Sequence, residues 1–253
     1  MSPEPAFLLH RRPYRETSAL VDLLTLDYGR VRAVAHGGQR PGSKSRQRLQ
    51  PFTPLFVTWQ GSRELKRLTL MESRGQTALL AGEGLLCGLY ANEIATRLLP
   101  LELPAPEVFA FYTALLEALP APAERALALR RYEWALLEAL EATPQFTTPE
   151  GGVLDPQFRY RFDTASRAFM PAERGLDGRT LRYIEQGDWQ HEGLANALKA
   201  VMRAALAPHL GTTVLRSREL MLDLARRRQR PNSILKLLSY RCAGGSMHPL
   251  GYC

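Results

Sequence analysis

Residues 19–36 read ALVDLLTLDYGRVRAVAH, and their pattern indicates the architecture of the first part of the chain. Two short apolar runs, Ala19–Leu26 and Val31–His36, are separated by the turn residues Tyr28 and Gly29. Apolar runs of this length bounded by turn residues predict two β-strands.

Three more runs of the same kind lie outward from this pair, at Ala6–His10, Leu55–Trp59 and Leu65–Met71. Turn residues separate all five runs, including the Gly37-Gly38 and Pro41-Gly42 pairs. Five strands within the first 75 residues predict a small closed barrel, and a five-stranded barrel is typical of the OB-fold.

After Glu83 the spacing of apolar residues changes to that of amphipathic helices. Several of these helices are too short to persist alone, so we expect them to pack together. The predicted helical segments are 85–98, 108–119, 123–142, 191–210 and 216–227.

Residues 143–175 lack this periodicity and contain four prolines and a Gly-Gly pair. They predict a long irregular excursion with one hairpin, whose arms are Phe158–Phe162 and Arg167–Met170. The whole chain is therefore predicted to be an α+β, multidomain protein, with an N-terminal OB-fold domain at 1–78, a C-terminal α-helical domain at 79–230 and a loose tail at 231–253.

Composition narrows the class of protein. The chain has 253 residues, of which 45% are hydrophobic and 23% charged, as in soluble globular proteins. It has no apolar run of about 18 residues and no secretory-type N-terminus, so we expect no membrane span. The three scattered cysteines, Cys87, Cys242 and Cys253, suit a reducing cytoplasm and exclude both a disulfide framework and a four-cysteine zinc site.

Positive charge is concentrated at the two ends of the chain. The net charge of +8 divides into +7 for residues 1–75, −5 for 76–215 and +6 for 216–253. The chain has 29 Arg but only 4 Lys, and Arg can grip phosphate through two hydrogen bonds. A GC-rich genome is the alternative explanation for the Arg excess, but it does not explain why positive charge is concentrated in the N-terminal part. The distribution favours a polyanionic partner for the first part of the chain.

The loop from Gly37 to Arg48 holds four cations and no acid. It departs from a phosphate-binding P-loop because Ser43 separates Gly42 from Lys44. We therefore expect it to contact a nucleic-acid backbone, with a P-loop-like nucleotide-hydrolysing enzyme and an RNA-binding OB module as the alternatives. The candidate DNA-binding residues of the first domain are Arg11, Arg30, Arg32, Arg40, Lys44, Arg46, Arg48, Lys66 and Arg67. The aromatic residues Phe52, Phe56 and Trp59 belong either to the core or to a base-stacking surface.

No catalytic or metal-binding pattern is visible. The five histidines have no metal-ligand spacing, and no nucleophile elbow or dinucleotide-binding glycine motif is present. We therefore expect a protein that is not an enzyme and has no cofactor and no metal.

Two arginines of the helical part lie among apolar residues. Arg130 lies close to Tyr132 and Trp134 in the sequence, and Arg203 is surrounded by Val201, Met202 and Ala204. An arginine at the rim of an apolar groove can receive a peptide with an acidic or free-carboxylate end. The alternative is an internal salt bridge, for example to Glu133 or Glu93.

An ordered series of motifs resembles the bacterial RecO family of recombination mediators. The series covers about residues 6–225, and the whole ordered set is more specific than any single motif. It comprises AFLLHRRPYRETS (6–18), YGRVR (28–32), the loop 35–50, LQPFTPL (49–55), ELK (64–66), GLYANE (88–93), LRRYE (129–133) and LRSREL (215–220).

The resemblance implies a DNA repair protein that has no catalytic activity. It also implies a location in the cytoplasm, in association with the nucleoid. RecO proteins bind single- and double-stranded DNA, anneal complementary strands and, with RecR, help to load RecA onto DNA covered by single-strand binding protein (SSB). Their helical domain receives the acidic C-terminal tail of SSB. The motif match makes Arg130 and Arg203 the candidate tail-binding residues.

The chain departs from the family at two places. Many members carry a four-cysteine zinc site in the excursion, but residues 143–175 contain no cysteine, so no metal is expected there. His36 stands where relatives often have Lys before the first glycine of the loop, which reduces the charge at neutral pH.

Overall fold

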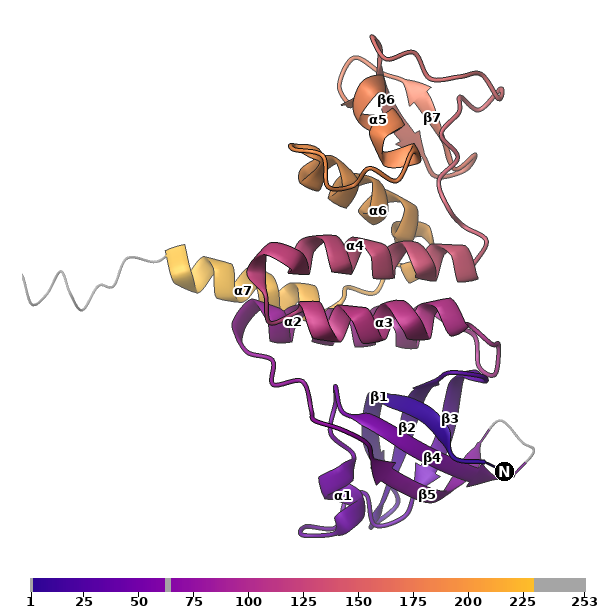
Figure 1. The fold of residues 1–253 in the computed structure, drawn as a ribbon, viewed down its shortest axis with the longest axis vertical. Coiled ribbons are helices and arrows are strands. Elements are labelled where there is room, and N and C mark those ends of the chain that lie inside the picture. Colours follow the sequence, from indigo (N-terminus) through magenta and orange to yellow (C-terminus); the bar gives the residue numbers. More distant parts are fainter. Residues whose placement is uncertain (1, 62–64, 230–253) are drawn as a thin grey trace, which may run out of the picture.

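The computed structural model describes residues 2–61 and 65–229, and its N-terminal part is a closed barrel (Figure 1). The strands are hydrogen-bonded in the order β1-β2-β3-β5-β4. β3 and β5 are parallel, and the other neighbouring pairs are antiparallel. The predicted five-stranded, OB-like barrel is therefore confirmed. Its strands are β1 (Glu4–Tyr14), β2 (Ser18–Thr25), β3 (Gly29–Ala35), β4 (Pro54–Gln60) and β5 (Lys66–Ser73).

Strand β2 is buried on both faces, because it lies between two hydrophobic cores. Ala19, Val21 and Leu23 alternate along the strand and belong to the core inside the barrel. Leu24 and Phe7 of β1 belong instead to a second core that the barrel shares with the helices. One continuous apolar interface thus joins the barrel to the rest of the chain.

The five predicted helical segments form helices within a few residues of the expected positions. Pro106 and Pro122 each occupy the first turn of a helix, where the missing N–H of proline costs no hydrogen bond. Figure 1 shows α2 and α3 next to the barrel, α4 above them on the side away from the barrel, and α6 farther out. These helices are α2 (Gly82–Leu98), α3 (Pro106–Ala118), α4 (Pro122–Ala139), α6 (Leu194–Leu210) and α7 (Arg216–Gln229).

The excursion forms a small module at the end of the molecule opposite the barrel (Figure 1). Its antiparallel hairpin of β6 (Arg159–Asp163) and β7 (Ala168–Pro171) confirms the predicted hairpin, and β8 (Leu176–Asp177) pairs with β6. Helix α5 (Gly178–Glu185) was not predicted. It has only two turns, and its N-terminus is capped by the side chain of Asp177, which accepts a hydrogen bond from the backbone N–H of Thr180 at 2.9 Å.

The basic loop is more ordered than expected. Instead of a flexible loop, it contains the short helix α1 (Lys44–Arg48), because the Ser43 side chain caps the first turn by accepting a hydrogen bond from Arg46 N at 3.1 Å. The expected loose tail at 231–253 lies outside the described residues. Among the helices that the structure describes, none is both long and apolar enough to cross a bilayer.

Candidate nucleic-acid interface and peptide groove

The loop from Gly37 to Gln50 is packed against one end of the barrel. Gln39 N donates a hydrogen bond to Thr17 O at 3.0 Å, and the Ser43 hydroxyl donates to Gly37 O at 2.5 Å. A Cβ on Gly38 would lie 2.8 Å from the Cβ of Ala19, so only glycine allows this close approach. The loop therefore presents its cations from a supported backbone.

Five cations of this region form what we call the basic surface: Arg11, Arg40, Lys44, Arg46 and Arg48. All except Arg11, which is half-buried, are exposed. The guanidinium groups of Arg46, Arg48 and Arg11 each donate to a backbone carbonyl, at 3.4, 2.7 and 3.4 Å respectively. No ion pair to a carboxylate is recorded for these five cations within the described ranges, so their charge is available to a polyanion.

Three other candidate cations of the barrel are paired with carboxylates. Asp22 lies between Arg30 and Arg32, whose Nε atoms are 3.9 and 3.1 Å from its Oδ1. Lys66 is 6% exposed, and its Nζ lies 3.0 Å from Glu102 Oε1. These contacts place Lys66 at the junction between the barrel and the helices, away from the basic surface.

The remaining candidates of the barrel are divided between surface and core. Arg67 is exposed on β5. Phe52 and Trp59 are buried, so they serve the cores. Phe56 is half-buried, and the guanidinium carbon of Arg74 lies 4.5 Å from the centre of its ring.

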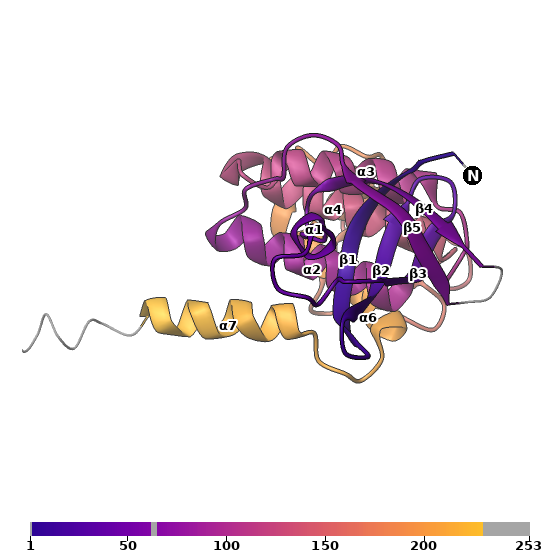
Figure 2. The same cartoon turned by 90° about the horizontal axis from the view of Figure 1, so that it is seen from below.

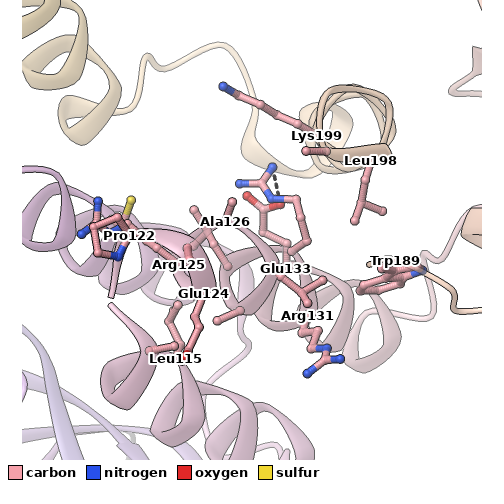
Figure 3. Close-up of a pocket in the computed structure, with 18 of the residues that line it drawn as sticks. Leu115, Pro122, Glu124, Arg125, Ala126, Arg131, Glu133, Trp189, Leu198 and Lys199 are labelled. Carbon is pink, nitrogen blue, oxygen red and sulfur yellow. Dashed lines mark ion pairs between the residues drawn. The ribbon is translucent and has the colours of Figure 1, made fainter. Parts of the chain in front are cut away.

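A groove of about 1000 Å³ lies in the helical part, between α4, α6 and the start of α7 (Figure 3). Leucines and Trp189 supply apolar lining. Six cations but only three carboxylates line it, so the groove suits an acidic ligand with an apolar end. The cations are Arg125, Arg130, Arg131, Lys199, Arg203 and Arg218, and the carboxylates are Glu83, Glu124 and Glu133.

A buried ion pair lies in the wall of this groove. Arg130 Nη1 is 2.9 Å from Glu133 Oε2, and the Tyr90 hydroxyl donates to Glu133 Oε1 at 2.7 Å. Burial raises the pKa of the Glu133 carboxyl, and the guanidinium of Arg130 offsets part of this effect. Despite their short separation, Arg130 Nη1 and Glu133 Oε2 form no hydrogen bond within the described part of the chain. The guanidinium of Arg130 is thus held by an ion pair in the wall of the groove.

The structure brings the two predicted tail-binding arginines together. Arg203, exposed on α6, is close enough to Glu133 to stabilise its charged form. Sequence reasoning missed Arg218, whose guanidinium carbon lies 5.6 Å from the centre of the Tyr90 ring. The sequence feature that could have identified Arg218 is its position in LRSREL, the last of the ordered motifs. The predicted internal salt bridge of Arg130 to Glu133 is confirmed, and Arg130 also lines the groove. Its role in binding a peptide stays a prediction.

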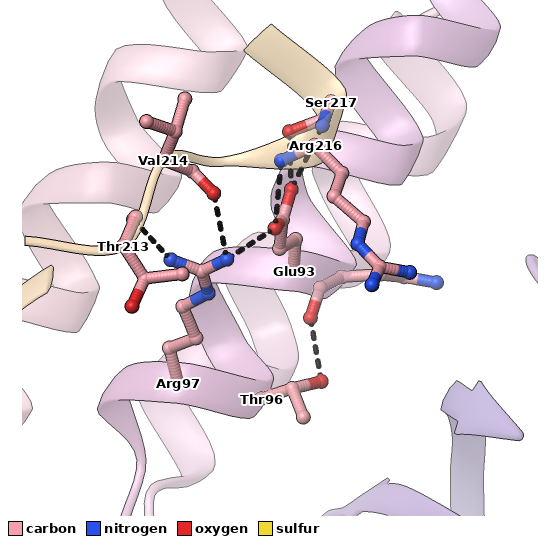
Figure 4. Close-up of polar contacts among 8 residues, drawn as sticks. Glu93, Thr96, Arg97, Thr213, Val214, Arg216 and Ser217 are labelled. Atoms are coloured by element: carbon pink, nitrogen blue, oxygen red, sulfur yellow. Dashed lines mark hydrogen bonds and ion pairs between the residues drawn. The ribbon is translucent and has the colours of Figure 1, made fainter. Parts of the chain in front are cut away.

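A single carboxylate holds the first turn of α7 in place (Figure 4). Glu93 of α2 accepts hydrogen bonds from Arg216 N at 3.0 Å and from Ser217 N and Oγ at 2.9 and 2.7 Å. Arg97 pairs with Glu93 at 2.8 Å and donates to Thr213 O at 2.7 Å and Val214 O at 3.1 Å. This clamp, made by Glu93 and Arg97, positions Arg218 beside the groove.

Because the clamp depends on an ionised Glu93, we expect it to contribute less to the free energy of unfolding at low pH. Burial of Glu93 opposes its ionisation. The hydrogen bonds from Ser217 and Arg216 and the charge of Arg97 together outweigh this effect, so the pKa of Glu93 lies below the usual 4.5. Its stabilisation is therefore fully present above pH 4.5 and is lost as the pH falls through the lowered pKa. Glu93→Gln should reduce the free energy of unfolding by about 1 kcal/mol at neutral pH, and by less in acid.

Urea unfolding of the Glu93→Gln variant and the parent chain at several pH values measures this difference. Glu173→Gln, at an exposed site, is the control and should match the parent at every pH. A Glu93→Gln effect that stayed constant down to the acid limit would contradict the assignment.

Comparisons with known proteins agree with this arrangement. Residues 1–76 match the family model for the N-terminal part of recombination protein O, and residues 80–219 match the model for its C-terminal part. A DNA repair protein RecO from Pseudomonas entomophila is 42% identical over 223 residues, covering 87% of this chain and 96% of the relative. RecO from Pseudomonas aeruginosa is 41% identical over 224 residues, 87% of this chain and 94% of the relative. RecO from Burkholderia orbicola is 38% identical over 232 residues, 88% of this chain and 83% of the relative.

The OB-like barrel, the helical part and these matches define a DNA repair and recombination protein. The match extends through both parts of the architecture. The chain belongs to the RecO family of DNA repair proteins.

Proposed function

We propose that the chain is a recombination mediator that binds single- and double-stranded DNA and anneals complementary strands. The observation that carries the proposal is the separation of two cationic sites. The basic surface lies on the barrel and the groove lies in the helices. We assign DNA binding to the OB-fold domain, residues 1–78, and protein binding to the helical domain, residues 79–230.

Annealing follows from charge neutralisation at the basic surface. Two DNA strands repel each other through their phosphates, and cations that neutralise both backbones release counterions and allow the bases to approach. The supported loop supplies Arg40, Lys44, Arg46 and Arg48 without a competing carboxylate ion pair in the described residues. This step requires neither a cofactor nor a bond-breaking residue, so we assign the chain no enzymatic activity.

The groove is proposed to receive the acidic C-terminal tail of SSB. Arg130 and Arg203 meet its carboxylates, while the apolar lining holds its hydrophobic end. Tail binding would bring annealing to SSB-coated DNA, where the chain acts with RecR to load RecA. These partners imply work in the cytoplasm, at the nucleoid.

Removing the buried charge pair tests the groove. The double variant Arg130→Met/Glu133→Leu replaces both partners, because removing Arg130 alone would leave Glu133 buried without its ion-pair partner. Loss of a charge-assisted contact of about 1.5–3 kcal/mol should weaken binding of an SSB-tail peptide by about 10- to 100-fold. Fluorescence anisotropy with labelled peptide measures this loss.

Annealing of naked complementary strands is the companion measurement, and it should stay at the parent rate. The effect of SSB on annealing should disappear in the same variant. An exposed change, Arg174→Met, is the matched control and should leave both assays unchanged. Equal losses in peptide binding and in naked-strand annealing would contradict the division between the two sites.

The two alternative functions predict other outcomes. An RNA-binding module would bind RNA more tightly than DNA of matched length and sequence. A nucleotide-hydrolysing enzyme would turn over ATP in a manner abolished by Lys44→Ala. The sequence disfavours the latter, because Ser43 separates Gly42 from Lys44, whereas a P-loop needs Lys directly after the glycine.

A further inference from the structure

The end of α7 carries a basic run that the proposed function does not use. Residues 226–242 read RRRQRPNSILKLLSYRC, with six Lys or Arg and no Asp or Glu. The run begins beyond residue 219, where the match to the family model ends. The run therefore lies outside the two segments that match the family models.

Helix α7 carries the first part of this run away from the body of the molecule. Contacts with Glu93 and Arg97 hold the N-terminal end of α7 in place. Its 14 residues correspond to about 21 Å of helix. Both views show the helix projecting beyond the other elements (Figures 1 and 2). An approaching macromolecule therefore meets the end of α7 without displacing another part of the described chain.

The described cation at this end, Arg226, is poorly neutralised. The side chain of Arg226 is 75% exposed, and its partner Asp223, at 3.7 Å, is 61% exposed. An ion pair this exposed contributes little and is easily exchanged for another anion. Arg227 and Arg228 occupy the next two helical positions, so the three cations span about 200° around the helix axis.

We propose that the end of α7 is a second contact for the phosphate backbone of nucleic acid. The choice of nucleic acid as the polyanion rests on the proposed function, and the charge pattern argues for the contact itself. Cations distributed around a projecting helix can meet phosphates from several directions, which suits sequence-independent binding. Together with the basic surface of the barrel, this contact gives the molecule two places to hold DNA.

The test uses the full chain with Arg226→Gln, Arg227→Gln and Arg228→Gln combined. Gln keeps a helix propensity close to that of Arg while removing the charge. The matched control ends the chain after Cys242, which removes 11 residues that contain no Lys, Arg, Asp or Glu. Single-strand affinity is measured by anisotropy over a range of salt concentrations, beside binding to vesicles of phosphatidylglycerol and phosphatidylcholine.

Loss of three phosphate contacts should reduce the magnitude of the slope of log affinity against log salt concentration by about 2. It should also weaken single-strand binding by about 10-fold or more in moderate salt. The control should bind like the parent chain. Unchanged affinity and slope in the triple variant would overturn the inference, as would an equal loss in the control. The inference would also be overturned if the triple variant lost vesicle binding but kept DNA binding, which would identify an anionic membrane as the partner.

Failure of this inference is distinguishable from failure of the proposed function. If reversing the charge of the basic surface abolishes DNA binding while the α7 variant binds normally, only the second contact is wrong. If the α7 variant loses binding while the basic-surface variant keeps it, the barrel is not the DNA-binding domain.

Discussion

Reversing the charge of Arg40, Lys44 and Arg46 to Glu should weaken single-stranded DNA binding about 100-fold at about 0.1 M salt. Each phosphate contact to a single strand contributes about 0.7 to the slope of log affinity against log salt, so three contacts contribute about 2. If all five cations of the basic surface meet phosphates, the parent slope from this surface is about −3.5, and the variant retains about −1.5. Filter binding or anisotropy across a salt series measures both values.

The same variant should remain folded, because helix α1 contains no buried residue. Its matched control reverses three exposed arginines of the excursion module, Arg161, Arg174 and Arg179, which changes the net charge equally. A general charge effect would weaken both variants alike. Equal weakening of DNA binding in both variants would therefore contradict the assignment of the basic surface. Weakening confined to the loop variant would support it.

Gly29→Ala should destabilise the protein by about 3 kcal/mol or more, the largest stability effect that we expect from a single methyl group. Gly29 has φ = 63°, and a Cβ at this position would lie 1.8 Å from the carbonyl oxygen of Leu103. Relieving the clash requires the backbone near Leu103 to move. That movement disturbs the hydrogen bond from Glu102 N to Arg30 O at 2.8 Å and the ion pair of Glu102 with Lys66.

The control for this substitution is Gly187→Ala. Gly187 has φ = 76°, but no atom beyond its chain neighbours lies within 4 Å of a Cβ built there. Its cost is limited to the left-handed backbone conformation, about 1–2 kcal/mol. Thermal unfolding should therefore show a fall in Tm of about 6 °C or more for Gly29→Ala and a smaller fall for the control. Equal falls would mean that the contact with Leu103 is unimportant.

The barrel could be predicted because its apolar residues and turns lie close together in the sequence. Ala19, Val21 and Leu23 alternate with outward-facing residues, and Gly29 marks the turn that follows. Helices α1 and α5 were missed because each is short. Their ends depend on the single capping side chains Ser43 and Asp177, which a search for apolar periodicity does not detect.

The candidate sites were harder to predict because the partners of their charges are distant in the sequence. Nothing in the local pattern shows that Lys66 meets Glu102 or that Arg30 and Arg32 share Asp22. The loop cations could be identified, since the loop has no acid of its own. Arg218 could be identified as a groove residue only from the fold, because α7 reaches Tyr90 only through its attachment to α2.

The shared core between barrel and helices fixes the distance between the basic surface and the groove. The Phe7 ring of the barrel lies 5.1 Å from that of Tyr112, and Asn92 accepts a hydrogen bond from Tyr112 at 2.5 Å while donating one to Leu8 O at 3.3 Å. A hinge at this joint would have to break buried aromatic and polar contacts at once, so the joint resists bending. The joint therefore makes the molecule a rigid spacer. If a DNA strand binds the barrel and a peptide binds the groove as proposed, their separation is constant, and any variation in distance has to come from the DNA or from the partner's own linker.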